Sequence, residues 1–501
     1  MQLIEETIKR GKTAIMLVPE ISLTPQMVDR FSARFGYENI AVMHSKLSQG
    51  ERFDTWEKIK KGKVKIVIGA RSAIFAPIQN LGIIIIDEEH DSSYKSDMPP
   101  KYNCKDIAKY IARKNDIPIV LGSATPDVAT YYKISQDKNA EVIRLTKRAN
   151  NSNLPEVKLV DLRKEIAEGN RSPFSTELKK LIQENIDNHK QTILFLNRRG
   201  FSTFVMCRDC GYTIKCKRCN ISLTYHYKEN KLKCHYCGYE INNISICPSC
   251  KSKNVKYFGT GTQKLEEIIK NEFPNATTIR MDIDTVSKKN SHEDILNNFK
   301  NENIDILIGT QMVVKGHHFP NVTLVGVIAA DTALNMEDYR ANEKTFDILT
   351  QVAGRAGREN QPGKVIVQTY NPENFCIQCA KEQNYDMFFD TEIVLRKQLK
   401  YPPFCDIIMF SITGISKEET KKASENLYKI LKNKSDIHIE IFNPMPAPID
   451  KIQNKYRWRI IAKGKLSNKL LDTINSALEE FYGLKYKNIS ISADINPMNM
   501  M

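Results

Sequence analysis

Residues 207–250 have the sequence CRDCGYTIKCKRCNISLTYHYKENKLKCHYCGYEINNISICPSC. This stretch contains eight of the chain's 12 cysteines, arranged as four Cys-x-x-Cys pairs: Cys207/Cys210, Cys216/Cys219, Cys234/Cys237 and Cys247/Cys250. Two cysteines at this spacing wrap around one tetrahedral zinc ion, and two such pairs complete a closed site. The stretch therefore predicts two structural zinc ions.

The spacing also indicates which pairs share a metal. Between Cys219 and Cys234, the alternating residues Leu223, Tyr225 and Tyr227 precede a Lys/Glu/Asn turn. This pattern predicts a hairpin that brings the two middle pairs together. We name them the inner zinc site, and the flanking pairs the outer zinc site. Interleaved or sequential pairing would also satisfy the spacing. Three of the pairs are followed directly by glycine or asparagine, which readily adopt the positive φ that a turn around a metal needs: Gly211, Asn220 and Gly238.

Length and composition narrow the class of protein. The 501 residues are enough for about three domains. The apolar run at 81–86 is far too short to span a bilayer, and the first residues do not resemble a signal peptide. Paired cysteines without a secretion signal predict a metal-binding protein of the cytoplasm, with no membrane partner.

The charge of the chain favours a polyanionic partner. The formal net charge is +15, and two zinc ions held by thiolates lower it to about +11. A basic protein of this kind suits nucleic acid. A lysine-rich solvated surface is the alternative interpretation.

Short apolar runs separated by helical stretches predict an α/β fold with two similar parallel-sheet lobes. In the first lobe the runs lie at 14–18, 64–68, 83–86 and 119–121, with helices at 22–35 and 104–115. After a polar linker at 149–155, further runs lie at 192–196, 304–308, 324–328 and 364–368. Strands buried on both faces and joined by helices form parallel sheets. The cysteine stretch is thus an insertion in the second lobe.

The last hundred residues predict a separate α+β unit. Strands at 406–413, 437–443, 457–463 and 487–493 alternate with helices at 417–433 and 466–481. This βαββαβ order is typical of a ferredoxin-like unit. The predicted division of the chain is lobe 1 (1–147), the first part of lobe 2 (148–204), the zinc insertion (205–255), the second part of lobe 2 (256–375), a connecting helix (376–400) and a C-terminal domain (401–501).

Two motifs indicate nucleotide chemistry. Asp87-Glu88-Glu89-His90 follows an apolar strand, where one carboxylate can hold magnesium and the next can orient a water molecule. Arg355 and Arg358 lie three residues apart on an expected helix, and could stabilise charge on a phosphoryl group. A charged loop and a surface arginine pair are the alternatives. The turn at 122–126 could link a nucleotide site to nucleic acid.

The order of these and other motifs resembles the superfamily 2 DNA helicases. The further motifs are 19–26, Gly69-Ala70-Arg71-Ser72, Asn197-Arg198-Arg199-Gly200 and 309–317. The cysteine insert after Gly200 and the tail around Pro446–Trp458 resemble the bacterial primosomal helicases that restart stalled replication forks. The resemblance covers essentially the whole chain, and it implies two RecA-like lobes, an ATP- and magnesium-dependent 3′-to-5′ activity, and the nested zinc pairing.

The resemblance also implies roles for individual residues. Catalytic roles fall to Asp87, Glu88, His90, Arg355 and Arg358, and coupling roles to Ser123, Thr125 and Gln351. DNA contacts are expected from Thr24, Gln26, Arg71, Ser72, Tyr94, Tyr102, Arg198, Thr310, Lys315 and His317. Residues 94–102 would be an aromatic loop that couples DNA contact to hydrolysis. Lys101 and Lys105 replace the family's usual arginines, which predicts weaker contacts with phosphate or base. Implied partners are forked and single-stranded DNA, single-stranded-DNA-binding protein and other primosome proteins.

The sequence departs from the family's pattern at its start. Gly11-Lys12-Thr13 has Glu6 where a phosphate-binding loop needs glycine, and Thr13 leads into a strand rather than a helix. We expect the chain to begin a few residues after that loop, without the family's N-terminal DNA-binding region and the first sheet's phosphate-loop strand. Two hypotheses follow: a replication-restart helicase, or a zinc-stabilised fragment that binds DNA and primosome proteins without hydrolysing ATP. A third, an RNA helicase, is disfavoured by the zinc insert.

Overall fold

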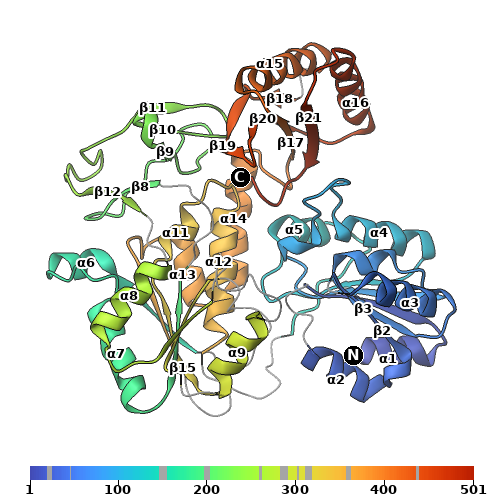
Figure 1. Ribbon diagram of the computed structural model, residues 1–501, viewed down its shortest axis with the longest axis horizontal. Coiled ribbons are helices and arrows are strands. Elements are labelled where there is room, and N and C mark those ends of the chain that lie inside the picture. The colour runs from blue at the N-terminus through green and yellow to red at the C-terminus, as the bar shows by residue number, and fades with distance from the viewer. Residues whose placement is uncertain are drawn as a thin grey trace. The chain divides into compact units, whose positions relative to one another are not determined.

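The computed structural model describes residues 1–19, 25–45, 47–145, 155–196, 204–258, 262–281, 291–301, 304–310, 319–356, 363–435 and 439–500. The chain separates into two compact units, Met1–Tyr131 and Tyr132–Met501 (Figure 1). Of the predicted linker at 149–155, only Pro155 belongs to the described residues. Among the described residues, no helix is both long and apolar enough to cross a membrane.

The first unit is a five-stranded parallel sheet in the order β2-β3-β1-β4-β5. Its strands are β1 (Thr13–Leu17), β2 (Ile40–Met43), β3 (Ile66–Gly69), β4 (Leu81–Ile86) and β5 (Ile119–Leu121). Its helices are α1 (Gln2–Lys9), α2 (Pro25–Phe35), α3 (Gln49–Lys60), α4 (Cys104–Asn115) and the start of α5 (Val128–Ser135). The predicted parallel lobe is confirmed, and β2 and α3 are among the elements that were not predicted.

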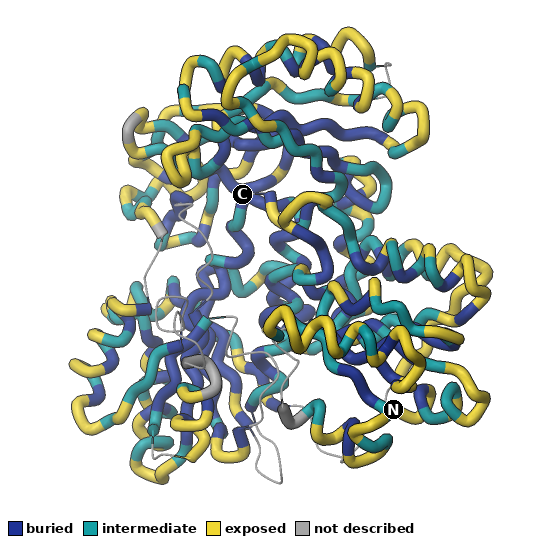
Figure 2. The backbone as a smooth tube through the Cα atoms, turned by 45° about the vertical axis from the view of Figure 1, so that its right-hand side comes forward, coloured by how far each residue is buried: buried dark blue, intermediate teal, exposed yellow. Residues whose placement is uncertain are grey.

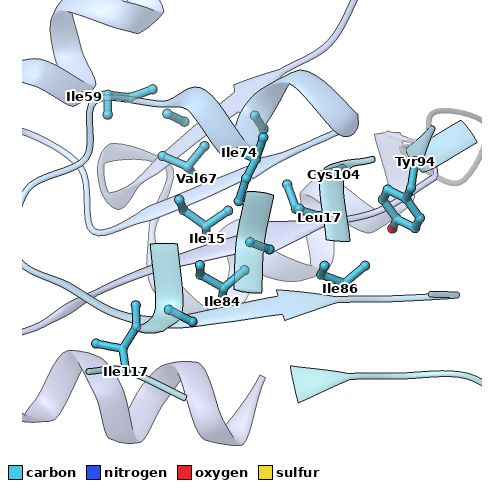
Figure 3. Packing of buried hydrophobic residues seen from close by; sticks show 14 of the residues in the cluster. Ile15, Leu17, Ile59, Val67, Ile74, Ile84, Ile86, Tyr94, Cys104 and Ile117 are labelled. Atoms are coloured by element: carbon cyan, nitrogen blue, oxygen red, sulfur yellow. The ribbon is translucent and has the colours of Figure 1, made fainter. Parts of the chain in front are cut away.

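The sheet of lobe 1 is buried on both faces. Ile15 and Leu17 of β1 pack with Ile84 and Ile86 of β4 in one cluster (Figure 3), while Ala14 belongs to a second cluster. Burial on both faces removes the polar alternation of a half-exposed strand, which is why the apolar runs were recognisable in the sequence. The register pairs Leu17 with both Gly69 and Ile86, so the carboxyl ends of three strands are level.

The second lobe contains a six-stranded parallel sheet in the order β13-β14-β7-β15-β16-β6. Its strands are β6 (Glu156–Asp161), β7 (Gln191–Phe195), β13 (Thr278–Met281), β14 (Ile306–Gly309), β15 (Val322–Val327) and β16 (Lys364–Thr369). Its helices are α6 (Leu162–Ala167), α7 (Thr176–Asp187), α8 (Thr262–Glu272), α9 (Ser291–Asn301), α11 (Asp331–Leu334), α12 (Ala341–Ala353) and α13 (Phe375–Lys381). Its central strands are buried and many residues of its helices are exposed (Figure 2). The predicted second lobe is confirmed.

The cysteine stretch forms a zinc module, residues 204–258, whose sheet has the order β11-β10-β9-β8-β12. The strands are β8 (Phe204–Cys207), β9 (Thr224–His226), β10 (Lys231–Lys233), β11 (Glu240–Asn242) and β12 (Val255–Phe258). Strands β9 and β10 are antiparallel, with Tyr225 opposite Leu232. This pair is the hairpin that the alternating residues predicted.

The C-terminal domain follows helix α14 (Tyr385–Gln398) and has the sheet order β18-β20-β17-β21. Its elements are β17 (Asp406–Gly414), α15 (Lys417–Lys434), β18 (Glu440–Ile441), β19 (Met445–Ile452), β20 (Lys455–Gly464), α16 (Asn468–Gly483) and β21 (Ile489–Ile495). Without β19, this is the order of the predicted ferredoxin-like unit. Strand β19 pairs with β20 and was not predicted.

Buried polar contacts join the three parts of the second unit. The Ser222 hydroxyl of the zinc module donates to Asn335 Oδ1 of lobe 2 at 3.0 Å. The Tyr401 hydroxyl donates to the carbonyl oxygen of Cys219 at 2.9 Å. Arg459 of the C-terminal domain donates to the carbonyl oxygen of His235 at 2.6 Å. Each contact crosses a boundary between two parts, so the zinc module is a structural element of the whole unit.

The boundary between the zinc module and lobe 2 yields a test of packing. Gly211 has a φ of +73, and a methyl group on it would overlap the carbonyl oxygen of Tyr370. We expect Gly211→Ala to lower the free energy of unfolding of the second unit by at least about 2 kcal/mol. Gly169, with a φ of +92 and nothing within 4 Å, is the matched control, and its alanine variant should lose only about 1 kcal/mol. Equal losses in chemical denaturation would contradict the contact with Tyr370.

Candidate nucleotide site and zinc centres

Asp87 lies at the carboxyl end of β4, whose neighbours in the sheet are β1 and β5. Its backbone N–H donates to the carbonyl oxygen of Leu17 at 2.9 Å. Its side chain reaches the surface, while desolvation by the surrounding protein raises its pKa. Glu88 follows with a φ of +45, a left-handed conformation that turns the chain directly after the strand. Two carboxylates thus follow the strand end where the sequence predicted a magnesium and water site.

The third carboxylate of this motif is structural. Glu89 is 2% exposed and forms an ion pair with Lys105 of α4, with Oε2 and Nζ 2.8 Å apart. Its other oxygen accepts from the backbone N–H of Asp127 at 2.7 Å. Burial raises the pKa of Glu89, and the nearby ammonium of Lys105 opposes that shift. Lys105 is therefore buried rather than available to phosphate or base, which corrects the prediction of DNA contact there.

Tyr94 was expected to contact DNA, and its burial does not fit that expectation. Its side chain is 1% exposed, and its hydroxyl donates to the carbonyl oxygen of Asp87 at 2.6 Å. The aromatic loop that it begins is closed by a bridge between Lys95 and Asn103 and by a hydrogen bond from Ser96 N–H to the carbonyl oxygen of Tyr102. The Tyr94 hydrogen bond thus connects the loop to the end of β4, where Asp87 lies.

Arg71 and Tyr102 lie together on the other side of this loop. The Arg71 guanidinium donates to the carbonyl oxygens of Ser93 and Lys95, and lies 5.9 Å from the centre of the Tyr102 ring. The Tyr102 ring also meets Phe75 edge-on at 5.2 Å. Ser72 is exposed beside Arg71. The structure therefore gathers three of the predicted DNA-binding residues, Arg71, Ser72 and Tyr102, around the aromatic loop.

The turn after β5 contacts the Asp87–His90 motif directly. His90 Nδ1 lies 2.7 Å from the Ser123 hydroxyl oxygen, and that oxygen accepts from the backbone N–H of Thr125 at 3.0 Å. Thr125 is 1% exposed. A displacement of either motif would therefore reach the other through one hydrogen bond, as the predicted coupling role of Ser123 requires.

The predicted site residues of lobe 2 that the structure describes lie at or just after the ends of strands and helices. Thr310 directly follows β14, whose last residue Gly309 pairs with Phe195 of β7. Gln351 lies in the last turn of α12, but the helix ends at Ala353 and Arg355 lies in the following turn. The expectation that Arg355 lies on a helix is wrong, because Gly354 and Gly357 disfavour helix continuation. Six predicted residues or their side chains lie outside the described residues: Thr24, Gln26, Arg198, Lys315, His317 and Arg358.

The four cysteine pairs have the same backbone turn. In each, the N–H of the residue after the second cysteine donates to the carbonyl oxygen of the first cysteine, at 2.9–3.0 Å. That residue has a positive φ in all four turns: Gly211, Asn220, Gly238 and Lys251. The first three were predicted from their residue types. Lys251 was not, since lysine carries no such signal.

The sulfur positions fit two tetrahedral metal sites. The four Sγ atoms of the inner site, and separately those of the outer site, all lie within 4.8 Å of one another. Three of the cross-pair sulfur–sulfur distances are 3.5–3.6 Å: Cys207–Cys250, Cys210–Cys247 and Cys216–Cys237. A tetrahedron with zinc–sulfur bonds of about 2.3 Å has edges near ~3.8 Å. The grouping is the nested one, and the sites have four protein ligands each, as structural zinc requires.

The other four cysteines lie outside these two sites. Cys104, Cys376 and Cys379 are fully buried, and Cys405 is partly exposed. Cys376 and Cys379 lie on helix α13. Burial raises the pKa of the Cys376 thiol, which disfavours the thiolate that binds a metal.

Family models match most of the chain. Residues 1–134 match the DEAD/DEAH box helicase model and residues 243–360 the helicase conserved C-terminal domain. Residues 216–241 match the PriA DNA helicase Cys-rich region (CRR) domain, and residues 397–498 the primosomal protein N C-terminal domain. The four matches follow the order of lobe 1, zinc module, lobe 2 and C-terminal domain.

Curated relatives agree over the full chain. The chain is 48% identical to the replication restart protein PriA of Bacillus subtilis, over 100% of this chain and 62% of that protein. It is 36% identical to the protein of the same name from Treponema pallidum, over 99% of this chain and 74% of that protein. It is also 36% identical to the protein of that name from Haemophilus influenzae, over 100% of this chain and 68% of that protein. The chain thus spans about three fifths of the length of the Bacillus subtilis relative.

The buried ion pair of lobe 1 yields a stability test. We expect Lys105→Met to lower the free energy of unfolding of lobe 1 by about 3–5 kcal/mol, because Glu89 is left buried without its cation. The double variant Glu89→Gln/Lys105→Met should recover most of this loss, since it leaves no unpaired charge. Urea denaturation of the full chain measures both. A single variant as stable as the native chain would contradict the pairing.

The zinc sites yield a test of metal content. We expect about two zinc ions per native chain by elemental analysis, and about one after Cys234→Ser, because three thiolates do not complete the inner site. Cys405→Ser is the control and should keep two, since Cys405 lies outside both groups. If Cys234→Ser kept two zinc ions, Cys234 would not be a required zinc ligand.

Proposed function

This chain belongs to the family of replication restart proteins PriA, and from that premise we propose that it forms the motor of an ATP-dependent DNA helicase. The observation that carries the proposal is the strand-end motif of lobe 1. Asp87 and Glu88 follow a buried parallel strand, and Tyr94 and His90 connect them to the aromatic loop and to Ser123. Structural zinc sites and a DEAD-type lobe in one chain fit this family.

The proposed roles follow from position. Asp87 would hold the magnesium ion that accompanies ATP, and Glu88 would orient the attacking water. Arg355 and Arg358 would stabilise charge on the transferring phosphoryl group, with Gln351 beside them. Magnesium, when bound, supplies positive charge to the phosphates. The chain's own residues supply the carboxylates, the guanidinium groups and the link from Asp87 through Tyr94 to the aromatic loop.

DNA contact is proposed for the residues around that loop. Arg71, Ser72 and Tyr102 combine a cation, a hydroxyl and a ring within one segment, which suits phosphate contact and base stacking. Thr24, Gln26, Arg198, Thr310, Lys315 and His317 complete the proposed single-strand path. We further propose 3′-to-5′ movement, recognition of stalled forks, and assembly with single-stranded-DNA-binding protein and other primosome proteins, as the family resemblance implies.

A second candidate function is DNA binding without ATP hydrolysis. The observation that favours it is Glu6, which occupies the first glycine position of a phosphate-binding loop ahead of Gly11-Lys12-Thr13. Thr13 is moreover the first residue of strand β1, whereas a phosphate-binding loop precedes a helix. This segment therefore does not supply the backbone amides that hold phosphates.

One experiment separates the two candidates. We measure ATP hydrolysis by the purified chain, with its zinc bound, in the presence and absence of single-stranded DNA, and we measure DNA affinity in parallel. If the chain hydrolyses ATP, Glu88→Gln should lower the DNA-stimulated rate at least about 100-fold, while Glu177→Gln, which alters a partly exposed glutamate of α7 that pairs with Lys158, should not.

Each result has a distinct meaning. DNA binding without hydrolysis supports the second candidate. Hydrolysis that survives Glu88→Gln contradicts the role proposed for Glu88. A zinc-loaded chain that neither binds DNA nor hydrolyses ATP contradicts both candidates.

A further inference from the structure

Three tyrosines of the zinc module form an aromatic cluster at its surface. The Tyr225 and Tyr257 rings lie 4.4 Å apart at an angle of 33°, and Tyr227 meets Tyr225 edge-on at 6.5 Å. Tyr227 is 85% exposed and Tyr257 is 48% exposed. Large rings with this exposure, clustered together, mark a binding surface more often than a packing defect. We name these three residues the tyrosine cluster.

Hydrogen bonds hold the cluster in place. The Tyr225 hydroxyl donates to Asn230 Oδ1 at 3.1 Å, and Asn243 Nδ2 donates to the Tyr257 hydroxyl at 3.0 Å. Asn243 Nδ2 also lies 3.2 Å from Asn230 Oδ1, so the two amides connect both rings. Tyr225 pairs with the fully buried Leu232 across the hairpin. The Tyr225 and Tyr257 rings are therefore ordered before any partner binds, which lowers the entropic cost of binding.

The net charge of the zinc module that carries the cluster favours an anionic partner. Residues 204–258 contain ten lysines and arginines against three acidic residues, and two zinc ions with eight thiolates leave a net charge of about +3. Two of the acidic residues, Glu229 and Glu240, are each paired with lysines of β10. The third, Asp209, accepts hydrogen bonds from Ser252 and Asn254. The two glutamates are therefore offset by lysines, whereas Asp209 keeps its negative charge beside the outer zinc site.

We propose that the tyrosine cluster is a stacking platform for unpaired bases of single-stranded DNA. The inference rests on the DNA-binding function proposed above and assigns part of that binding to the zinc module. Aromatic faces stack on any base, and surrounding lysines attract the backbone, without a need for sequence-specific hydrogen bonds. The bases of a duplex are already stacked on one another, so the platform favours single strands.

The test compares strands with and without bases. Affinity of the full zinc-loaded chain is measured for fluorescently labelled oligo-dT and for an abasic strand of the same length. Each stacked base contributes enough affinity for about a 10-fold change on removal of its aromatic partner. We expect Tyr227→Ala/Tyr257→Ala to weaken oligo-dT binding by about 10-fold or more. Its affinity for the abasic strand, which keeps only the phosphates, should not change.

Three controls separate the alternatives. Zinc content shows that the variant is folded. Tyr227→Phe/Tyr257→Phe keeps both rings and should retain native affinity for oligo-dT. Tyr110→Ala removes a 66% exposed tyrosine on α4 of lobe 1 and should have no effect.

Four outcomes would overturn the inference. If the alanine variant binds oligo-dT as tightly as the native chain, the platform does not bind bases, and a protein partner becomes the better explanation of the exposed rings. Equal weakening on both strands would assign the effect to phosphate contacts. Weakening by the phenylalanine variant would assign it to the hydroxyls. A native chain that binds neither strand would contradict the proposed function itself.

Discussion

A buried carboxylate, Glu337, connects the zinc module to lobe 2 and to the C-terminal domain. Its side chain is buried in lobe 2, where it accepts from the Thr224 hydroxyl at 3.0 Å and from the backbone N–H of His235. Arg459 of the C-terminal domain lies 3.9 Å away. Burial raises the pKa of Glu337 to about 7 despite these partners. A buried carboxylate is tolerated only when its donors are in place, and His235 follows Cys234, so the inner zinc site positions one of them.

The effect of this contact extends along α12. Between Glu337 and the start of the helix, Asp338 forms ion pairs with Arg340 and Lys344, and Arg340 donates to the carbonyl oxygen of Pro497 near the end of the chain. Helix α12 then continues through Gln351 to Ala353, and Arg355 follows two residues after its end. The segment that carries the proposed phosphoryl-stabilising arginine is thus fixed at its start by the zinc module and the C-terminal domain. The zinc module thus contributes to the packing of lobe 2 at the start of this segment.

The sequence was most informative where a local pattern determines geometry. Cysteine spacing and the alternation around Tyr225 predicted both zinc sites and their hairpin, because metal ligation and strand pairing act over short distances along the chain. Fully buried strands such as β4 were likewise recognisable. Features that depend on partners distant in the sequence could not be predicted. Lys105 is buried because it pairs with Glu89, and β19 forms because it pairs with the edge of β20. The end of α12 before Arg355 was missed because the spacing of Arg355 and Arg358 was interpreted as helical.

The tyrosines illustrate why residue type alone does not fix function. Tyr94 was expected at the DNA surface from its place in a motif, yet its ring is enclosed in the lobe 1 core and its hydroxyl is bound to Asp87. Tyr227, which served in the sequence only as a hairpin residue, presents its ring to solvent. A buried tyrosine needs a partner for its hydroxyl, so it can connect two segments, whereas an exposed ring offers a face to a ligand. The tertiary environment therefore assigns the connecting role to Tyr94 and the binding role to the tyrosine cluster.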